Sequence, residues 1–261
     1  VFRPVENDKN SLYNNNIGTI CGDKQGHIYI RCKYAVAEYD IKRNTFHTIR
    51  DNDIQAITYG NTRLWACTRD SLFTYNRITD KLDYYYNLNG VRISCVTEDS
   101  DGNLYVGTMN NGLYMIDSNK KWLNYLPKKD ITCVYEDSKK SIWVGTKNDG
   151  LFRLDRNGGI TAYGSASHQN MLSSSYVRCI VEDNLGNYWI GTFKGLDKLD
   201  VTTGTFTHYS KDNKQYSLSN SSIICMMKDR QGTFWIGTYY GGINLFNPDY
   251  EIYTIGRASC R

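Results

Sequence analysis

The chain has 261 residues, of which 31 are basic and 27 acidic, giving a net charge of +4. The basic residues are scattered, which argues against a nucleic-acid-binding face, and no apolar stretch approaches the roughly 20 residues of a transmembrane helix. This length suits a single all-β domain that needs no disulfide to be stable. The chain starts at Val1 with no initiator Met and no signal-peptide pattern, so we expect a segment of a longer protein.

A four-residue pattern recurs along the chain at intervals of 36 to 46 residues. Its first two copies are degraded, the third carries a tyrosine, and the last three contain Trp, a β-branched residue, Gly and Thr. In chain order the copies are Tyr29-Ile30-Arg31-Cys32, Trp65-Ala66-Cys67-Thr68, Tyr105-Val106-Gly107-Thr108, Trp143-Val144-Gly145-Thr146, Trp189-Ile190-Gly191-Thr192 and Trp235-Ile236-Gly237-Thr238. A near-constant period of this size indicates a repeat architecture.

Each repeat holds four short segments rich in β-branched and aromatic residues, bounded by Asp, Asn, Gly or Ser. Four antiparallel strands per repeat are typical of a β-propeller blade. We therefore predict an all-β fold, a β-propeller of six four-stranded blades, with repeats near residues 17–50, 54–86, 91–126, 130–163, 176–209 and 222–255. In the Asp-x-x-Gly turns, such as Asp99 to Gly102, Asp is expected to cap the turn and Gly to supply a positive φ. The glutamate before this Asp, as in Glu98, is expected to be solvated.

The aromatic residue of the pattern is expected to fill the wedge between adjacent blades, and the glycine to let the next sheet approach closely. This places Trp65, Trp143, Trp189 and Trp235 in the core. Outside the six repeats, residues 2–5 resemble the outer strand of a blade. The leading hypothesis is six blades of a larger, seven-bladed ring, and a closed six-bladed ring is the alternative.

The eight cysteines are not expected to form disulfides. Cys95, Cys133, Cys179 and Cys225 stand at equivalent positions of four repeats. Equivalent positions in neighbouring blades lie about 10 Å or more apart, the spacing of packed sheets, and a disulfide cannot span that distance. We expect these cysteines to be small buried fillers.

The repeat resembles a known family. The pattern Asp-x-x-Gly-x-x-Trp-x-Gly-Thr-x-x-Gly-Leu-x-x-hydrophobic-Asp is similar to the two-component regulator propeller repeat. Gly150 to Asp155 and Gly195 to Asp200 complete this pattern, and Gly242 to Pro248 closes the last copy with small departures. The resemblance covers nearly the whole chain, strongly from about Val91 onward, whereas the first two copies have Arg31 and Cys67 in place of the glycine.

The resemblance implies a periplasmic location. In this family such propellers form the sensor region of inner-membrane histidine kinases, many of them hybrid kinases of gut Bacteroidetes that respond to products of polysaccharide breakdown. It further implies that the parent protein is a kinase, that the receptor is a homodimer, and that other blades and domains of the parent chain are partners. Nothing in the resemblance calls for a cofactor.

No catalytic or metal-binding pattern stands out among the four histidines, His27, His47, His168 and His208. None has metal-ligand spacing with another His, Cys or carboxylate, and no nucleophile elbow is present. The stretch that begins at Asp99 lacks the Glu that ends a calcium loop. We therefore expect no catalysis, no metal and no cofactor in this segment.

The residues that vary between repeats are better candidates for function. In a four-stranded blade, the turn between the second and third strands shares one end with the segment that leads into the first strand, and loops on a rigid scaffold often carry binding residues. We predict that these positions surround one mouth of a central channel and bind an oligosaccharide or another small ligand, especially an anionic one. The predicted binding residues are Arg69, Arg92, Asn110, Asn111, Lys147, Asn148, Asp149, Arg178, Phe193, Lys194, Tyr239 and Tyr240.

Three functions remain open at this stage. The preferred one is a non-catalytic sensor module of a two-component kinase, in which a ligand stabilises one arrangement of a dimer. A protein-interaction scaffold that uses the same face is the alternative. A propeller lyase or hydrolase would need convergent histidine and acidic groups, which the sequence does not reveal.

Overall fold

The structure is a computed structural model that describes residues 2–23, 25–50, 53–163, 171–212 and 217–248. The described residues form strands β1 to β23 and no helix, so this part of the chain holds no helix of the length and apolarity that crossing a membrane requires. The chain divides into two compact units, an N-terminal unit of residues 1–128 and a C-terminal unit of residues 129–261, and each is described by itself.

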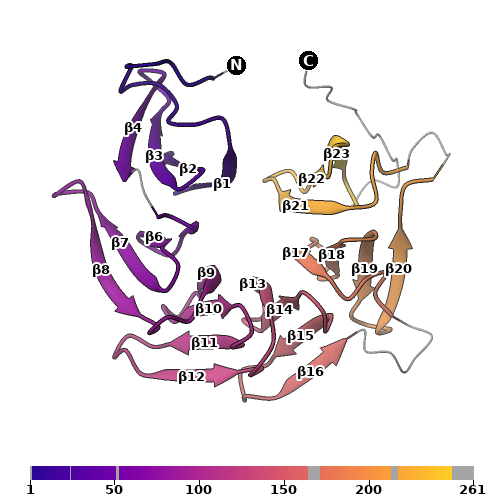
Figure 1. The fold of residues 1–261 in the computed structure, drawn as a ribbon. Coiled ribbons are helices and arrows are strands. Elements are labelled where there is room, and N and C mark those ends of the chain that lie inside the picture. Colours follow the sequence, from indigo (N-terminus) through magenta and orange to yellow (C-terminus); the bar gives the residue numbers. More distant parts are fainter. Residues whose placement is uncertain (1, 24, 51–52, 164–170, 213–216, 249–261) are drawn as a thin grey trace. The chain divides into compact units, whose positions relative to one another are not determined.

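Each unit contains three antiparallel sheets, which we number as blades 1 to 6 in chain order (Figure 1). Blade 1 consists of β1 (Ile17–Gly22), β2 (Ile28–Cys32), β3 (Ala35–Asp40) and β4 (Thr45–Arg50). Blade 2 consists of β5 (Ala56–Tyr59), β6 (Leu64–Cys67), β7 (Ser71–Asn76) and β8 (Lys81–Asn87). Blade 3 consists of β9 (Ile93–Glu98), β10 (Leu104–Thr108), β11 (Leu113–Ile116) and β12 (Trp122–Tyr125).

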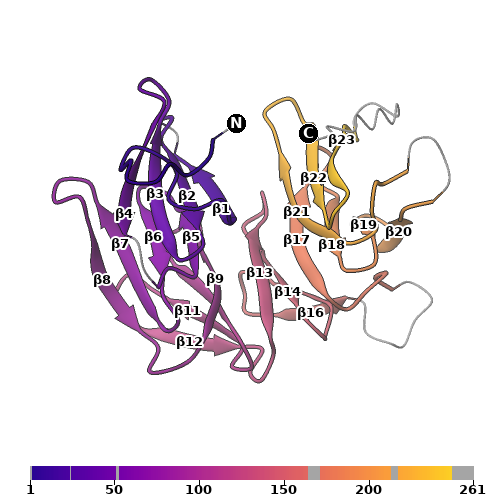
Figure 2. The same ribbon diagram turned by 45° about the horizontal axis from the view of Figure 1, so that its top comes forward.

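The C-terminal unit holds the other three blades. Blade 4 consists of β13 (Ile131–Glu136), β14 (Ile142–Thr146), β15 (Leu151–Leu154) and β16 (Ile160–Tyr163). Blade 5 consists of β17 (Val177–Glu182), β18 (Tyr188–Thr192), β19 (Leu196–Asp200) and β20 (Thr205–Tyr209), and blade 6 consists of β21 (Ile223–Lys228), β22 (Phe234–Thr238) and β23 (Gly242–Phe246). The first strands of these blades, β13, β17 and β21, lie side by side (Figure 2).

This architecture confirms the predicted all-β propeller fold with its six blades. The predicted outer strand of the sixth blade, near residues 251–255, lies outside the described residues. Residues 2–5 were expected to resemble an outer strand, but they are not in a strand. Instead the ring of Phe2 packs edge-on against Tyr39 and Phe46 of blade 1, with centroid distances of 5.1 and 5.2 Å.

The Asp-x-x-Gly turns form as predicted. Asp99 Oδ1 accepts the backbone N–H groups of Asp101 and Asn103 at 3.0 and 2.7 Å. Gly102 has a φ of 87° and donates its N–H to the carbonyl of Asp99. A left-handed residue of this kind costs glycine little, because glycine has no Cβ.

The pattern tryptophan joins its own turn to the next blade. Trp143 is fully buried, and its indole N–H donates to Asp137 Oδ2 at 2.8 Å. The hydroxyl of Tyr188, from blade 5, donates to the same oxygen at 2.7 Å, and the two rings lie 4.1 Å apart between centroids. One carboxylate therefore satisfies both polar groups that this aromatic contact buries.

The pattern glycine allows close approach of the next blade, as predicted. A Cβ added to Gly145 would lie 2.5 Å from Cys133 Sγ and 2.6 Å from Val177 of blade 5. Blade 2 solves the same problem differently, because Cys67 takes the glycine position there and faces the smaller Ala56. Cys67 is fully buried against blade 3. Blades 2 and 3 therefore pack closely although cysteine replaces the motif glycine.

The expectation that the turn glutamate is solvated is wrong. Glu98 of blade 3 accepts the N–H of Asn61 at 2.8 Å and the indole N–H of Trp65 at 3.1 Å, both from blade 2. Glu182 of blade 5 is buried and accepts the N–H and hydroxyl of Ser138, from blade 4, at 2.7 Å each. These carboxylates connect successive blades at the Asp-x-x-Gly turns.

Two other expectations fail in blade 6. Trp235 is 40% exposed and Cys225 is exposed, whereas both were predicted to be buried. Blade 6 is the last blade of its unit, so no following blade of that unit covers this face. The described cysteines are all free thiols, as predicted.

Candidate ligand-binding site

The predicted binding residues are divided between the two units. All of them except Arg178 are exposed, and Arg178 is half-buried. The N-terminal unit carries Arg69, Arg92, Asn110 and Asn111, and the C-terminal unit carries Lys147, Asn148, Asp149, Arg178, Phe193, Lys194, Tyr239 and Tyr240.

In the N-terminal unit, backbone hydrogen bonds join the turn between the second and third strands of a blade to the segment that leads into a first strand. The carbonyl of Arg69 accepts the N–H of Ile93 at 2.7 Å, and the carbonyl of Arg92 accepts the N–H of Met109 at 2.9 Å. The turn between the second and third strands therefore lies beside the segment that leads into a first strand, as the sequence analysis predicts. The side chains of both arginines are exposed at this end of their blades.

In blade 4 the corresponding turn is Lys147-Asn148-Asp149. Lys147 donates its N–H to the carbonyl of Asp130 at 3.0 Å. Asp149 Oδ1 pairs with Lys129 Nζ at 2.7 Å, and its N–H donates to Thr146 Oγ1 at 2.9 Å. Because Asp149 pairs with Lys129, it is not the partner of Lys147 within this turn.

The most developed group of side chains is in blades 5 and 6, and we call it the aromatic–arginine cluster: Tyr176, Arg178, Phe193, Tyr239 and Tyr240. Phe193 is 50% exposed and stacks on Tyr176, with centroids 6.2 Å apart and planes 15° from parallel. The guanidinium carbon of Arg178 lies 4.7 Å from the Tyr176 centroid and 5.1 Å from the Phe193 centroid. A cation at these distances is attracted to the negative faces of both rings.

Ser222 connects the two blades within this cluster. Arg178 Nη1 donates to Ser222 Oγ at 2.9 Å and to the carbonyl of Ile223 at 3.0 Å. The carbonyl of Ser222 accepts the N–H of Tyr239 at 2.9 Å. The rings of Tyr239 and Tyr240 then meet edge to face, with centroids 4.3 Å apart.

Tyr240 adopts an unusual backbone conformation. Its φ is 53° and its side chain is 91% exposed. Asn110 occupies the equivalent position of blade 3 with a φ of 62°, and asparagine tolerates this region far better than a bulky aromatic residue. A tyrosine in this region costs about 1 kcal/mol, and its ring is exposed rather than packed in the core.

The guanidinium of Arg178 is held in place by neutral groups. Its hydrogen-bond acceptors among the described residues are one hydroxyl and one carbonyl, and no described carboxylate pairs with it. The rigid fork of a guanidinium matches carboxylate and sulfate groups. The cluster thus combines a fixed cation with exposed aromatic rings, a combination that suits an anionic ligand with apolar faces.

A buried polar network lies directly behind the Phe193 turn, and sequence reasoning missed it. Asp197 is fully buried, and its carboxylate accepts hydrogen bonds from His208 Nδ1 at 2.7 Å and from the N–H and hydroxyl of Ser173 at 2.9 Å each. Burial raises the pKa of Asp197, although the hydrogen bonds from His208 and Ser173 oppose this rise. The spacing of His208 along the chain pointed to no carboxylate partner, because the pairing with Asp197 arises across the β19–β20 ladder.

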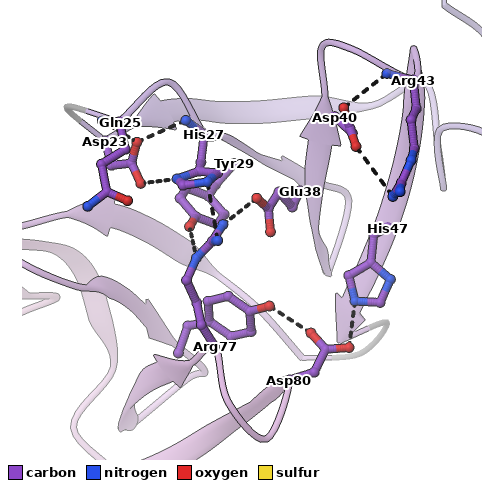
Figure 3. Close-up of polar contacts among 11 residues, drawn as sticks. Asp23, Gln25, His27, Tyr29, Glu38, Asp40, Arg43, His47, Arg77 and Asp80 are labelled. Carbon is purple, nitrogen blue, oxygen red and sulfur yellow. Dashed lines mark hydrogen bonds and ion pairs between the residues drawn. The ribbon is translucent and has the colours of Figure 1, made fainter.

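A second polar cluster, in the N-terminal unit, is closed by its own partners (Figure 3). Arg77 of blade 2 donates to the hydroxyl of Tyr29 at 3.3 Å, to Glu38 and to His27 Nε2 at 3.2 Å. Because arginine only donates, Nε2 of His27 is the acceptor, and its Nδ1–H donates to Asp23. This cluster links blades 1 and 2 rather than forming a binding site.

Another contact between blades 1 and 2 pairs His47 Nε2 with Asp80 Oδ2 at 2.7 Å (Figure 3). The hydroxyl of Tyr75 donates to the other oxygen of Asp80 at 2.6 Å. The three described histidines thus each bind one aspartate, which spacing along the chain did not predict. In the described part of the chain, no group of three or more His, Cys, Asp and Glu side chains is placed to hold a metal. His168 lies outside the described residues.

Repeated blades with the same aspartate, aromatic and glycine contacts define this protein as a β-propeller built from sequence repeats. The sequence profile of the two-component regulator propeller family matches residues 87–110, 125–148, 171–194 and 217–240. The chain therefore contains four two-component regulator propeller repeats, as the resemblance in its sequence predicts. Each match ends within the turn that carries the predicted binding residues. A comparison with curated proteins gives no match.

Solved structures of several kinds share the fold. The extracellular domain of BT3049, described as a hybrid two component system of B. thetaiotaomicron, has a TM-score of 0.65 and 20% identity over 98% of this chain and 41% of that chain. PorZ, a surface component of the type-IX secretion system of Porphyromonas gingivalis, has a TM-score of 0.70 and 15% identity over 94% of this chain and 42% of that chain. Virginiamycin B lyase from Staphylococcus aureus has a TM-score of 0.68 and 12% identity over 91% of this chain and 85% of that chain. At these identities the likeness concerns the fold alone.

Proposed function

We propose that this chain is a ligand-sensing propeller segment from the extracytoplasmic, periplasmic region of a two-component sensor, with a hybrid histidine kinase as the parent protein. The propeller repeats carry this proposal, because they are named for two-component regulators. The shared fold with the extracellular domain of a hybrid system from B. thetaiotaomicron agrees with it. The segment itself binds and does not catalyse, and its partners are the other domains of the parent chain and a second copy of the receptor.

We further propose that the ligand is an oligosaccharide that carries carboxylate or sulfate groups, and that the aromatic–arginine cluster binds it. The single observation behind this assignment is the guanidinium of Arg178, which neutral acceptors fix beside the exposed ring of Phe193. Sugar rings stack their apolar faces on aromatic side chains, while a guanidinium binds an anionic substituent with paired hydrogen bonds. Tyr239 and Tyr240 extend the aromatic surface from the neighbouring blade.

The experiment is calorimetric titration of the full chain with tetragalacturonate and with maltotetraose, two probes of equal length of which only the first is charged. The first should bind and the second should bind weakly or not at all. The double variant Tyr239→Ala with Tyr240→Asn should weaken binding by about tenfold or more, since each factor of ten corresponds to about 1.4 kcal/mol. Asparagine is chosen because Asn110 has the same backbone conformation in blade 3.

Leu185→Ala is the matched control, because Leu185 is an exposed apolar side chain in the β17–β18 turn of blade 5. It should leave binding unchanged. Unaltered affinity in the tyrosine double variant would show that the cluster is not the site. Equal affinity for both probes would remove the anionic specificity, and a protein–protein complex without any saccharide response would favour an interaction scaffold.

A further inference from the structure

Asp197 is a buried carboxylate at a position where other blades carry different side chains. In the β19–β20 ladder it stands opposite His208, whereas the equivalent pair in blade 4 is Phe152 opposite Ala162. Asp197 Oδ1 accepts from His208 Nδ1, and Oδ2 accepts from the N–H and hydroxyl of Ser173. Among the charged groups of the described residues, His208 is the one that hydrogen-bonds to Asp197, and the side chain of His208 is 47% exposed.

The hydrogen bonds continue from Asp197 to the turn that carries Phe193. Ser173 Oγ lies 2.9 Å from Thr192 Oγ1. Thr192 Oγ1 accepts the N–H groups of Lys194 at 3.2 Å and Gly195 at 3.1 Å, and its hydroxyl is placed to donate to the carbonyl of Gly195 at 2.9 Å. Two hydroxyl groups therefore connect the buried carboxylate to the backbone of this turn.

Blade 6 contains the same connection with an amide in place of the carboxylate. Asn244 Oδ1 accepts the N–H of Ser219 at 3.0 Å, so Nδ2 is the atom that donates to Ser219 Oγ at 2.9 Å. The Ser219 hydroxyl must then donate to Thr238 Oγ1 at 2.9 Å, and Thr238 donates to the carbonyl of Gly242 at 3.2 Å. The protons all point from the amide toward the turn.

In blade 5 the protonation state of Asp197 decides this direction. An ionised carboxylate only accepts, so the Ser173 hydroxyl donates to it. The single hydroxyl proton of Thr192 then has two competing acceptors, Ser173 Oγ and the carbonyl of Gly195. If Asp197 Oδ2 takes up one proton from solvent, the carboxyl donates to Ser173, Ser173 to Thr192, and Thr192 to Gly195. The two hydroxyls only rotate, and the order becomes that of blade 6.

We propose that Asp197 is a positioning residue. Its protonation reverses the direction of the hydrogen bond between the two hydroxyl groups and stabilises the Phe193 turn, which makes ligand binding dependent on pH. The part concerning the ligand rests on the proposed function, whereas the part concerning the turn does not. Burial raises the pKa of Asp197, although the hydrogen bonds from His208 and Ser173 oppose this rise. The carboxyl group therefore takes up its proton at a higher pH than an exposed aspartate does. Affinity should rise as the pH falls through this pKa.

The first test needs no ligand. The amide ¹H and ¹⁵N shifts of Lys194 and Gly195 are followed from about pH 4 to pH 8, a range that covers the usual carboxyl and imidazole groups. In the wild type these amides should titrate together. Asp197→Asn copies the amide of blade 6 and should abolish that titration, and His208→Ala removes a donor that favours the carboxylate and should move the midpoint to higher pH.

The amides of residues 239–242 in blade 6 are the internal control, because Asn244 does not titrate, and they should not follow the same midpoint. The proposal is overturned if the Lys194 and Gly195 amides do not titrate in the wild type, or if they titrate unchanged in Asp197→Asn. Folding of that variant is checked from the remaining amide shifts.

The second test measures tetragalacturonate affinity over the same pH range. The ratio of the wild-type and Asp197→Asn dissociation constants is used, because the ligand's own titration cancels in it. This ratio should change by about threefold or more, the effect of one net hydrogen bond. A constant ratio would overturn the link between the turn and binding. Absence of any wild-type binding would overturn the proposed function, and the amide titration would still decide the role of Asp197.

Discussion

Substitution of the pattern glycine in blade 5 should destabilise the protein through a clash between two blades. In Gly191→Ala the new Cβ would lie 2.6 Å from Ile223 Cγ2 of blade 6, and it would also press on Cys179 Sγ. Carbon atoms prefer separations of about 3.5–4.0 Å, so one sheet must move by roughly 1 Å. Overpacking of this kind costs about 1–3 kcal/mol. Alanine offsets about 0.4–1 kcal/mol of this cost, because it lowers the conformational entropy of the unfolded chain relative to glycine.

We therefore expect a net loss of about 1–2 kcal/mol of unfolding free energy. Gly237→Ala is the matched control, because among the described residues of its unit its Cβ would meet Cys225 Sγ and backbone but no atom of another blade. Cys225 is exposed and can rotate away, so this variant should change stability by less than about 0.5 kcal/mol, as surface substitutions usually do. Urea unfolding followed by tryptophan fluorescence, with the thermal midpoint as a second measure, compares the two proteins.

The double variant Cys179→Ala with Gly191→Ala tests the contact itself. Blade 2 already pairs a small Ala56 with a larger residue at the glycine position, so the second substitution should relieve part of the strain. The two changes should be non-additive by about 0.5 kcal/mol or more, as is usual for residues in contact. Equal destabilisation by Gly191→Ala and Gly237→Ala, or strict additivity in the double variant, would refute this account.

Two further predictions concern pH and thiol chemistry. Burial would raise the pKa of Asp23, but hydrogen bonds from His27 lower it below its usual value. The ionised Asp23 therefore stabilises the folded protein above the unfolded pKa near 3.9, and this stabilisation is lost as the pH falls through the folded pKa. The urea midpoint of Asp23→Asn should fall less steeply in acid than that of the wild type, and identical pH profiles would contradict this. Burial raises the pKa of the Cys179 thiol well above its usual value, whereas Cys225 is exposed. In the native protein iodoacetamide should therefore modify Cys225 well before Cys179, as read by mass spectrometry of peptides, and equal rates would show that the blade interface opens.

The sequence could reveal the fold because the information is local and repeated. Each repeat encodes its own Asp-x-x-Gly turn, and the turn of Asp99 forms the same hydrogen bonds whatever lies around it. The role of the pattern glycine was also predictable, since close approach of the next blade explains why glycine recurs near tryptophan in successive copies. The topology of a blade further fixed which turns share an end, and this is why Phe193 and Tyr239 could be named as candidates.

What joins these candidates was decided by contacts between residues far apart in the chain. Arg178 and Ser222 are 44 residues apart and meet only because blade 6 packs on blade 5. Asp197 and His208 are neighbours only through the register of the β19–β20 ladder.

By itself, then, the sequence determined the blades, their turns and the ends at which variable residues gather, because those depend on short-range backbone and packing rules that every copy repeats. The tertiary structure decided which side chains share a hydrogen bond, which carboxylates are buried and which tryptophan stays exposed. Trp189 and Trp235 illustrate the difference, since they occupy the same place in the repeat and are 1% and 40% exposed. Burial and partnership depend on the blade that packs alongside, and no single repeat encodes its neighbour.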